Sequence, residues 1–171
     1  MNYCDQCGTA LEVLNPNLEW RCPACQRNIY ANPVPTIDAM LFDEDGRILI
    51  GARKNEPSKG KLNLPGGFVD MNETLEQAIA RELKEELDLD ATDYSKLTYV
   101  SSRVDKYNYA GKERQLIPVI MVGDIAHRDF GPNEEVTEYF WKLPSELKPD
   151  ELTNHTEYDH IMEAARFKQK L

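Results

Sequence analysis

Seven carboxylates crowd the stretch from Gly66 to Leu89, and groups of this kind can bind a divalent metal ion. Glu82, Glu85 and Glu86 are spaced i, i+3 and i+4, which places them within about one quadrant of a helix at about 100° per residue. Like charges at this spacing repel one another and would weaken an isolated helix. A hard cation such as Mg²⁺ or Mn²⁺, which prefers oxygen ligands, offsets that repulsion.

A helix over residues 74–87 would position these carboxylates. Its leucines and one isoleucine recur every four residues and form one apolar stripe, namely Leu75, Ile79, Leu83 and Leu87. Either Asn72 or Thr74 can cap the N-terminus. A solvated acidic face is the ordinary alternative for such a helix. The acidic cluster borders the apolar stripe and follows a Gly-Gly turn, which favours a partly desolvated site instead.

The segment from Gly67 to Leu89 resembles the Nudix box, G-x5-E-x7-R-E-U-x-E-E-x-G-U, where U is aliphatic. Gly67, Glu73 and the run Arg81–Glu86 occupy the fixed positions of that motif. One position departs, because Asp88 stands where the family has glycine. That glycine normally ends the helix in a left-handed conformation, which Asp tolerates better than most other residues.

The resemblance implies a metal-dependent hydrolase whose cofactor is Mg²⁺ or Mn²⁺. The implied metal ligands are Glu82, Glu85, Glu86 and a backbone carbonyl of the glycine turn, with Gly66 the candidate. Arg81 is implied to orient the carboxylates by charge-assisted hydrogen bonds, and Glu73 to support the loop. Hydrolysis of a diphosphate needs charge neutralisation and an activated water. Clustered carboxylates titrate as a unit, so no single one is assigned as the general base.

Candidates outside the box are fewer and less specific. Many family members draw a further Glu from another loop, and Glu135 is our candidate for that base or ligand; a solvated loop charge is the alternative. Arg53, Arg103 and Arg114 are candidates to bind phosphate, with surface salt bridges as the alternative. Tyr107 is a candidate to stack on a base.

All four cysteines lie in the first 25 residues, as Cys4-x-x-Cys7 and Cys22-x-x-Cys25. Paired knuckles of this kind are typical of a tetrahedral zinc site, because each presents two thiolates to one ion. Two disulfides or a redox-active pair are the alternatives. A cytosolic context disfavours the disulfides, and the lack of a surrounding βαβ unit disfavours the redox-active pair. We expect a structural Zn²⁺ without a catalytic role, since four thiolates leave no open position.

These motifs divide the chain into a zinc ribbon at residues 1–32 and a Nudix domain at 36–171, joined by a proline-bounded linker. In the ribbon, short strands are expected at 17–21 and 28–30. In the larger domain, strands are expected at 37–42, 47–52, 96–107, 114–125 and 136–143, a helical turn at 144–147 and a second helix at 157–170. The fold class is α+β, an α-β-α sandwich with a mixed sheet, and the order of elements is similar to that of the Nudix fold.

Composition excludes several function classes. The net charge of −10 argues against a nucleic-acid partner, and the ribbon has only Arg21 and Arg27 as basic residues. No apolar run approaches 18 residues and no secretory signal is evident, so we expect no membrane partner and a cytoplasmic protein. Similar proteins are usually homodimers, although nothing in this sequence specifies an oligomeric state.

The expected substrate is a small nucleotide derivative. A four-cysteine ribbon before a Nudix domain looks like the ADP-ribose, NADH and FAD pyrophosphatases that carry such ribbons. Nothing between Leu89 and Gly131 matches the S-Q-P-W-P-F-P-x-S array of the NADH enzymes. We therefore predict hydrolysis of a nucleoside diphosphate linked to another moiety, with ADP-ribose first and FAD or NAD(H) next, releasing AMP. A non-catalytic nucleotide sensor and a nucleoside triphosphate pyrophosphohydrolase are the alternatives.

Overall fold

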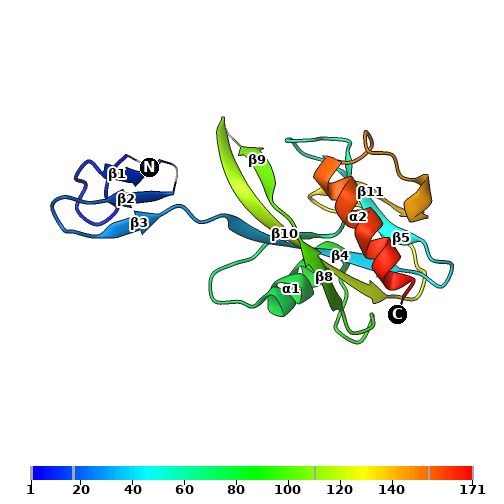
Figure 1. The fold of residues 1–171 in the computed structure, drawn as a ribbon. Coiled ribbons are helices and arrows are strands. Elements are labelled where there is room, and N and C mark those ends of the chain that lie inside the picture. The colour runs from blue at the N-terminus through cyan, green and yellow to red at the C-terminus, as the bar shows by residue number, and fades with distance from the viewer. Residues whose placement is uncertain (1, 17, 110, 154, 171) are drawn as a thin grey trace. The chain divides into compact units, whose positions relative to one another are not determined.

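The computed structural model describes residues 2–16, 18–109, 111–153 and 155–170, and the chain divides into two compact units, Met1–Pro33 and Val34–Leu171 (Figure 1). The first unit is an antiparallel sheet in the order β1-β2-β3, formed by β1 (Glu12–Asn15), β2 (Glu19–Arg21) and β3 (Asn28–Tyr30). The last two lie where strands were expected, although residue 17 lies outside the described residues. The fully exposed β1 has no alternating pattern that would have predicted it.

The second unit is built on a mixed sheet of eight strands, with the central order β11-β5-β4-β10-β8. β6 pairs with β5, β7 with β4, and β9 with β10. β10 runs parallel to β4 and antiparallel to both β8 and β9. The strands are β4 (Val34–Phe42), β5 (Ile48–Arg53), β6 (Leu62–Asn63), β7 (Gly66–Phe68), β8 (Thr98–Ser102), β9 (Asp105–Tyr109), β10 (Lys112–Asp124) and β11 (Val136–Lys142).

Two helices, α1 (Leu75–Leu87) and α2 (His155–Lys168), cover opposite faces of this sheet (Figure 1). The alternation of side chains along β4 explains the two layers. Ile37, Ala39 and Leu41 pack with the apolar stripe of α1, whereas Met40 and Phe42 pack with α2. The predicted α-β-α sandwich with a mixed sheet is confirmed, and a short 3-10 turn, η1 (Pro144–Glu146), precedes α2. Within the described part of the chain, no helix is long and apolar enough to cross a membrane.

Local sequence fixes both ends of α1. Thr74, rather than Asn72, is the N-cap. The hydroxyl of Thr74 accepts a hydrogen bond from the backbone N–H of Gln77. In return, the side-chain oxygen of Gln77 accepts a hydrogen bond from the backbone N–H of Thr74, which completes a capping box. At the other end Asp88 adopts the left-handed conformation, with φ 53° and ψ 37°. Asp88 therefore adopts the conformation expected of the glycine that the resembling motif has at this position.

Three regions of the second unit differ from the expected strands. The strand expected at 96–107 is divided into β8 and β9. No strand was expected at 62–63 or 66–68, which form β6 and β7. β7 pairs antiparallel with β4 and places Gly66 opposite Asp38. Gly66 has φ +147°, and a Cβ atom there would collide with the carbonyl oxygen of Ile37. Only glycine allows this close approach, which holds the start of the box against the central sheet.

Candidate active site

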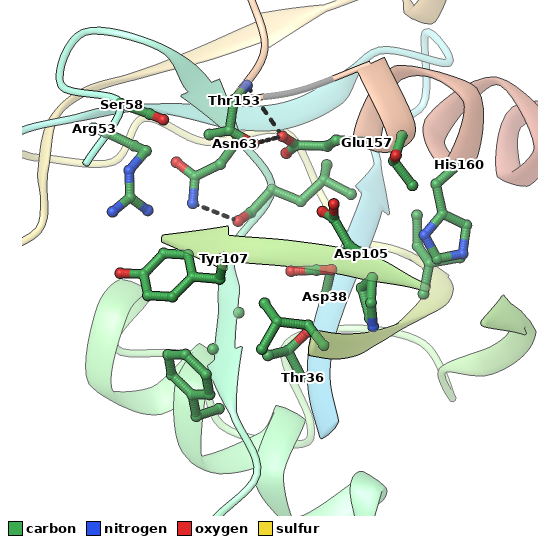
Figure 2. Close-up of a pocket in the computed structure, with 18 of the residues that line it drawn as sticks. Thr36, Asp38, Arg53, Ser58, Asn63, Asp105, Tyr107, Thr153, Glu157 and His160 are labelled. Atoms are coloured by element: carbon green, nitrogen blue, oxygen red, sulfur yellow. Dashed lines mark hydrogen bonds between the residues drawn. The ribbon is translucent and has the colours of Figure 1, made fainter. Parts of the chain in front are cut away.

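A cavity of about 600 Å³ opens beside the glycine turn and is lined by residues of the sheet, α1 and α2 (Figure 2). Several of the residues that the sequence singled out lie on its wall. They are Arg53, Gly66, Arg81, Glu82, Tyr107 and Glu135. The structure thus brings part of the box together with three candidates from distant positions in the chain.

Arg81 is the centre of a hydrogen-bond network within the box. Its guanidinium binds Glu73 through two hydrogen bonds, from Nε to Oε2 (3.1 Å) and from Nη2 to Oε1 (2.8 Å). Nη1 donates to Glu82 Oε1 (2.9 Å) and to Glu85 Oε2 (3.2 Å). Nη2 also donates to the carbonyl oxygen of Phe68 (3.0 Å). Hydrogen bonds from Arg81 lower the pKa of Glu73, so Glu73 remains ionised and anchors the guanidinium.

The carboxylate of Glu82 lies directly against the glycine turn. A Cβ atom at Gly67 would collide with this carboxylate, so a larger residue there would displace the Glu82 side chain. Burial raises the pKa of Glu82, the nearby charges of Glu85 and Glu135 raise it further, and Arg81 opposes the shift. Glu82 is therefore a partly desolvated carboxylate held in place by one cation.

Glu86 is the most strongly perturbed carboxylate of the box. Its pKa is raised to about 8, first by burial and then by the negative charges of Glu82, Glu135 and Asp38. A hydrogen bond from the backbone of Gly66 lowers the pKa and partly opposes this shift. Glu135, from a loop 49 residues further along the chain, is thus an electrostatic neighbour of the box. Carboxylates that repel one another in a partly buried site are a donor set that fits a hard divalent cation. Within the described residues, the four cysteines are the one group of three or more potential metal ligands whose ligand atoms all lie within 4.8 Å of one another. The oxygen atoms of the box carboxylates are therefore more widely spaced than the sulfur atoms of the cysteines.

Asn133, which the sequence analysis missed, connects the Glu135 loop to α1. Its side-chain oxygen accepts hydrogen bonds from the backbone N–H groups of Glu135 (2.8 Å) and Val136 (2.7 Å). Its amide nitrogen donates to the carbonyl oxygen of Glu86 and to the hydroxyl of Tyr139, each over 3.0 Å. An Asn two residues before a loop Glu is a signal for an Asx turn.

The three arginine candidates have different environments. Arg53 lines the cavity, and its Nε donates to the carbonyl oxygen of Pro57 (3.0 Å). Arg103 binds Glu163, with Nη2 2.8 Å from Oε2, and is not on the cavity wall. Arg114 lies exposed on β10, also outside the cavity lining. Of the three, the structure brings only Arg53 to the cavity.

A second set of carboxyl groups faces the cavity from three different elements. Asp38 on β4, Asp105 on β9 and Glu157 on α2 point toward the same region (Figure 2). Burial raises the pKa of Asp38 well above its usual value, and the charges of Glu157, Asp105 and Glu82 add to the shift. We term these three residues the acidic wall. Their positions in the sequence share no spacing, and only Asp38, a lone carboxylate in an apolar run, offered a local signal.

The cysteines of the first unit form a compact cluster. Their Sγ atoms all lie within 4.8 Å of one another, with 3.7 Å between Cys4 and Cys25 and 3.5 Å between Cys7 and Cys22. None of these four residues is in a disulfide. Zn–S bonds of about 2.3 Å in a tetrahedron place sulfur atoms about 3.8 Å apart, so the cluster has the dimensions of a four-thiolate zinc site.

Comparisons with known proteins agree with the motif. The ADP-ribose pyrophosphatase of Methanocaldococcus jannaschii is 46% identical over 61 residues, which cover 36% of this chain and 36% of that protein. The NAD-capped RNA hydrolase NudC of Vibrio vulnificus is 32% identical over 92 residues, which cover 54% of this chain and 34% of that protein. The chain therefore matches about a third of the length of these curated relatives.

The fold is shared with solved structures over nearly the whole chain. The crystal structure of a NUDIX hydrolase from Nitrosomonas europaea superimposes with a TM-score of 0.68 at 23% identity, covering 99% of this chain and 92% of that one. The family model described as NUDIX domain matches residues 32–164. The box, the fold and this match together show that the chain belongs to the Nudix hydrolase family.

Proposed function

We propose that this protein hydrolyses the diphosphate bond of a nucleoside diphosphate linked to a second moiety and releases AMP. ADP-ribose is the favoured substrate, followed by FAD and NAD(H). The observation that carries the proposal is that Glu82, Glu135 and Arg53 line one cavity, with the buried Glu86 an electrostatic neighbour of both carboxylates. The M. jannaschii relative is an ADP-ribose pyrophosphatase, which is consistent with the favoured substrate.

Glu82, Glu85 and Glu86, with the Gly66 carbonyl, would hold Mg²⁺ or Mn²⁺. When bound, the ion would supply charge neutralisation for the diphosphate. Arg81 keeps the carboxylates in place: Glu73 fixes one edge of its guanidinium, while Nη1 holds both Glu82 and Glu85. Arg53, one of the cationic residues on the cavity wall, contacts phosphate oxygens.

A carboxylate of this group accepts the proton of the attacking water. Burial and neighbouring charges raise the pKa of Glu86 to about 8 in the metal-free protein, and a bound divalent cation would lower it. Glu82 and Glu135 both contribute to that shift, so the three carboxylates exchange protons as a coupled group. Asn133 keeps Glu135 in this group by tying its loop to α1.

The acidic wall favours a linked moiety over a longer phosphate chain. Burial raises the pKa of Asp38 and of Glu157, so these carboxyl groups retain protons toward neutral pH and offer no positive charge to an additional phosphate. The same oxygens accept hydrogen bonds from hydroxyl groups. A neutral, hydroxyl-rich group such as ribose therefore suits this wall better than the terminal phosphate of a nucleoside triphosphate.

The ribbon is proposed to be structural. Residues 1–32 would hold one Zn²⁺ through Cys4, Cys7, Cys22 and Cys25, and residues 36–171 would carry the hydrolase site. The sulfur–sulfur distances of 3.5 and 3.7 Å support this assignment. With four thiolates the ion has no free coordination position, so it supplies stability and no chemistry.

The test is a substrate panel of ADP-ribose, NADH, FAD, dinucleoside polyphosphates and nucleoside triphosphates in Mg²⁺ or Mn²⁺. Wild type, Glu86→Gln and the matched control Glu76→Gln, an exposed position on the same helix, are compared. We expect AMP from one diphosphate-linked substrate in wild type and control, and its loss in Glu86→Gln. If no compound of the panel is hydrolysed but nucleotides still bind, the protein is a nucleotide sensor. If nucleoside triphosphates are the preferred substrates, it is a nucleoside triphosphate pyrophosphohydrolase.

A further inference from the structure

His160 on α2 is almost completely buried and yet borders the cavity. The residue is 3% exposed, and its ring lies at the part of the cavity wall that Asp105 and Glu157 also form (Figure 2). It takes no part in the proposed chemistry at the box. A buried imidazole beside a ligand-sized cavity can bind the ligand if one of its ring nitrogens is left for that purpose.

The partners of Nε2 show which ring nitrogen carries the proton. Nε2 of His160 lies 3.0 Å from the hydroxyl oxygen of Ser101 and 3.3 Å from the carbonyl oxygen of the same residue. The carbonyl can only accept, and the hydroxyl donates its own proton to Oε2 of Glu163 over 3.2 Å. Both oxygens therefore face Nε2 as acceptors, so Nε2 holds the proton.

Nδ1 of His160 is an acceptor that the protein leaves unused. Burial lowers the pKa of His160, and the charge of Arg103 lowers it further, against the hydrogen bond to Ser101 and the charge of Glu163, so the ring is neutral at neutral pH. None of the described residues donates a hydrogen bond to Nδ1. The enclosed side-chain atoms without a partner are Asn63 Oδ1 and Arg103 Nε, so Nδ1 is not enclosed and is reached from the cavity.

The box and His160 share this cavity. Gly66 and Glu82 line it together with His160. Asp38 lies opposite Gly66 in the pairing of β4 with β7, and the charges of both Glu82 and Glu157 act on its carboxyl group. Glu157 precedes His160 by three positions on α2, so the two share one face of the helix. A molecule whose diphosphate lies at the box can therefore extend past Asp38 toward His160.

We propose that His160 is a specificity-determining residue whose Nδ1 accepts a hydrogen bond from a hydroxyl group of the linked moiety. This inference rests on the proposed function and names the residue that recognises that moiety. A ribose carries hydroxyl donors that satisfy Nδ1, whereas the oxygens of a terminal phosphate are strong acceptors and find no donor there. A site that hydrogen-bonds a substrate hydroxyl discriminates against ligands that lack one.

Two ligands that differ in the linked ribose test this role without hydrolysis. They are the α,β-methylene analogues of ADP-ribose and of ADP, in which a P–C–P bridge replaces the bond to be cleaved. Calorimetry in Mg²⁺ gives the dissociation constant of each analogue. The ratio of the two constants reports the contribution of the ribose in each variant.

Two substitutions separate the roles of the two ring nitrogens. The amide nitrogen of Gln is as many bonds from Cβ as Nε2, so His160→Gln keeps the donor to Ser101 and loses the acceptor. The amide oxygen of Asn is as many bonds from Cβ as Nδ1, so His160→Asn keeps the acceptor and loses the donor. Ser101→Ala is the control, because it removes the hydroxyl beside Nε2 and Ser101 is not part of the cavity lining.

We expect His160→Gln to bind the ADP-ribose analogue about tenfold more weakly, the loss of one hydrogen bond, and the ADP analogue like wild type. His160→Asn and Ser101→Ala should keep the wild-type ratio. The proposed role of His160 is overturned if His160→Gln keeps the wild-type ratio, or if Ser101→Ala lowers the ratio as much as His160→Gln does. If wild type shows this dependence on His160 and yet hydrolyses no ADP-ribose, the proposed function alone is overturned.

Nitrogen NMR of protein labelled at its histidines reads the position of the proton directly. The chain has three histidines, and the signals missing in His160→Gln are those of His160. We expect the proton on Nε2, and an upfield shift of Nδ1 when the ADP-ribose analogue binds but not when the ADP analogue binds. A proton on Nδ1 in the free protein would overturn the role of His160 whatever the ligands do.

Discussion

The side-chain amide of Asn133 donates a hydrogen bond over 3.0 Å to the carbonyl oxygen of Glu86, near the last turn of α1. The oxygen of the same side chain accepts the backbone N–H groups of Glu135 and Val136. A single Asn therefore sets the distance between the helix that carries the box and the loop that carries Glu135. It contacts neither metal nor substrate in the proposed mechanism and acts by positioning.

Replacement of Asn133 by Ala should lower kcat about tenfold, because Glu135 is no longer held against the box. Asn133→Asp keeps the acceptor for the Glu135 loop and loses the donor to Glu86, so its kcat should lie between those of wild type and Asn133→Ala. The kcat values of both variants are measured by steady-state kinetics on the substrate that the panel identifies. Glu134→Ala is the matched control, an exposed residue of the same loop. Wild-type kcat in Asn133→Ala would contradict the positioning role of Asn133.

Mg²⁺ or Mn²⁺ should stabilise the wild-type protein by binding the folded state alone. Thermal unfolding in EDTA and in added metal measures the difference in Tm. Glu86→Gln removes one of several mutually repelling carboxylates, so its Tm in EDTA should equal or exceed that of wild type, while the rise on adding metal should be smaller. Its kcat should fall by about 10²–10³-fold, the loss of several kcal/mol of charge stabilisation. An equal rise in Tm for both proteins would place the metal elsewhere.

The purified chain should contain one Zn²⁺, and Cys22→Ser should lose it. Cys22 is fully buried, and the small sheet of residues 2–33 has few other apolar contacts, so the ribbon should unfold without the ion. Metal analysis gives the zinc content, and limited proteolysis should show cleavage confined to this segment. Gln6 is an exposed residue of the first knuckle, and Gln6→Ala should retain both the zinc ion and the resistance of the ribbon to proteolysis. A stable ribbon in Cys22→Ser would refute a structural role for the ion.

Glu157 should make stability depend on pH. Burial raises its pKa to about 7 in the folded protein, against about 4.3 in an unfolded chain. Between these values the folded state retains a proton that the unfolded state has released, so the free energy of unfolding falls as pH rises from about 4.3 to about 7. Glu157→Gln does not titrate. The free energy of unfolding of this variant minus that of wild type should grow by about 4 kcal/mol across that window.

Urea unfolding at several pH values between 4.5 and 8 measures this difference. Asp159 is an exposed carboxylate on the same helix, and Asp159→Asn is the control. Its free energy of unfolding should change with pH in the same way as that of wild type. A difference between Glu157→Gln and wild type that stays constant with pH would mean that Glu157 is as well solvated when folded as when unfolded.

Features with a local signal were predictable from the sequence. The apolar stripe of α1, its Thr74 cap and the left-handed Asp88 all follow from residues within a few positions of one another. The cysteine spacing likewise predicted the cluster, because two knuckles suffice to gather four thiolates. In each case the groups that interact are neighbours in sequence or belong to one short motif.

Features that depend on long-range pairing were not predictable. The parallel pairing of β10 with β4 has no sequence marker, and it helps to bring Asp38, Asp105 and Glu157 to one cavity. The same limit applies to the arginines: nothing near Arg53 or Arg103 in the sequence distinguishes the one at the cavity from the one bound to Glu163. Side-chain environment is set by the tertiary fold, and a single sequence reports it only weakly.

The register of β4 and β10 runs from Val34 opposite Leu116 to Phe42 opposite Asp124, so the entire box lies in the chain between the two paired strands. Closing a loop of about 80 residues has an entropic cost that must be met before its contacts form, which makes such pairings slow steps in folding. Helix α1 can form early from its own caps, whereas the cavity exists only after β10 has docked. A nascent chain that ends before residue 116 therefore carries the complete motif and no site for a substrate.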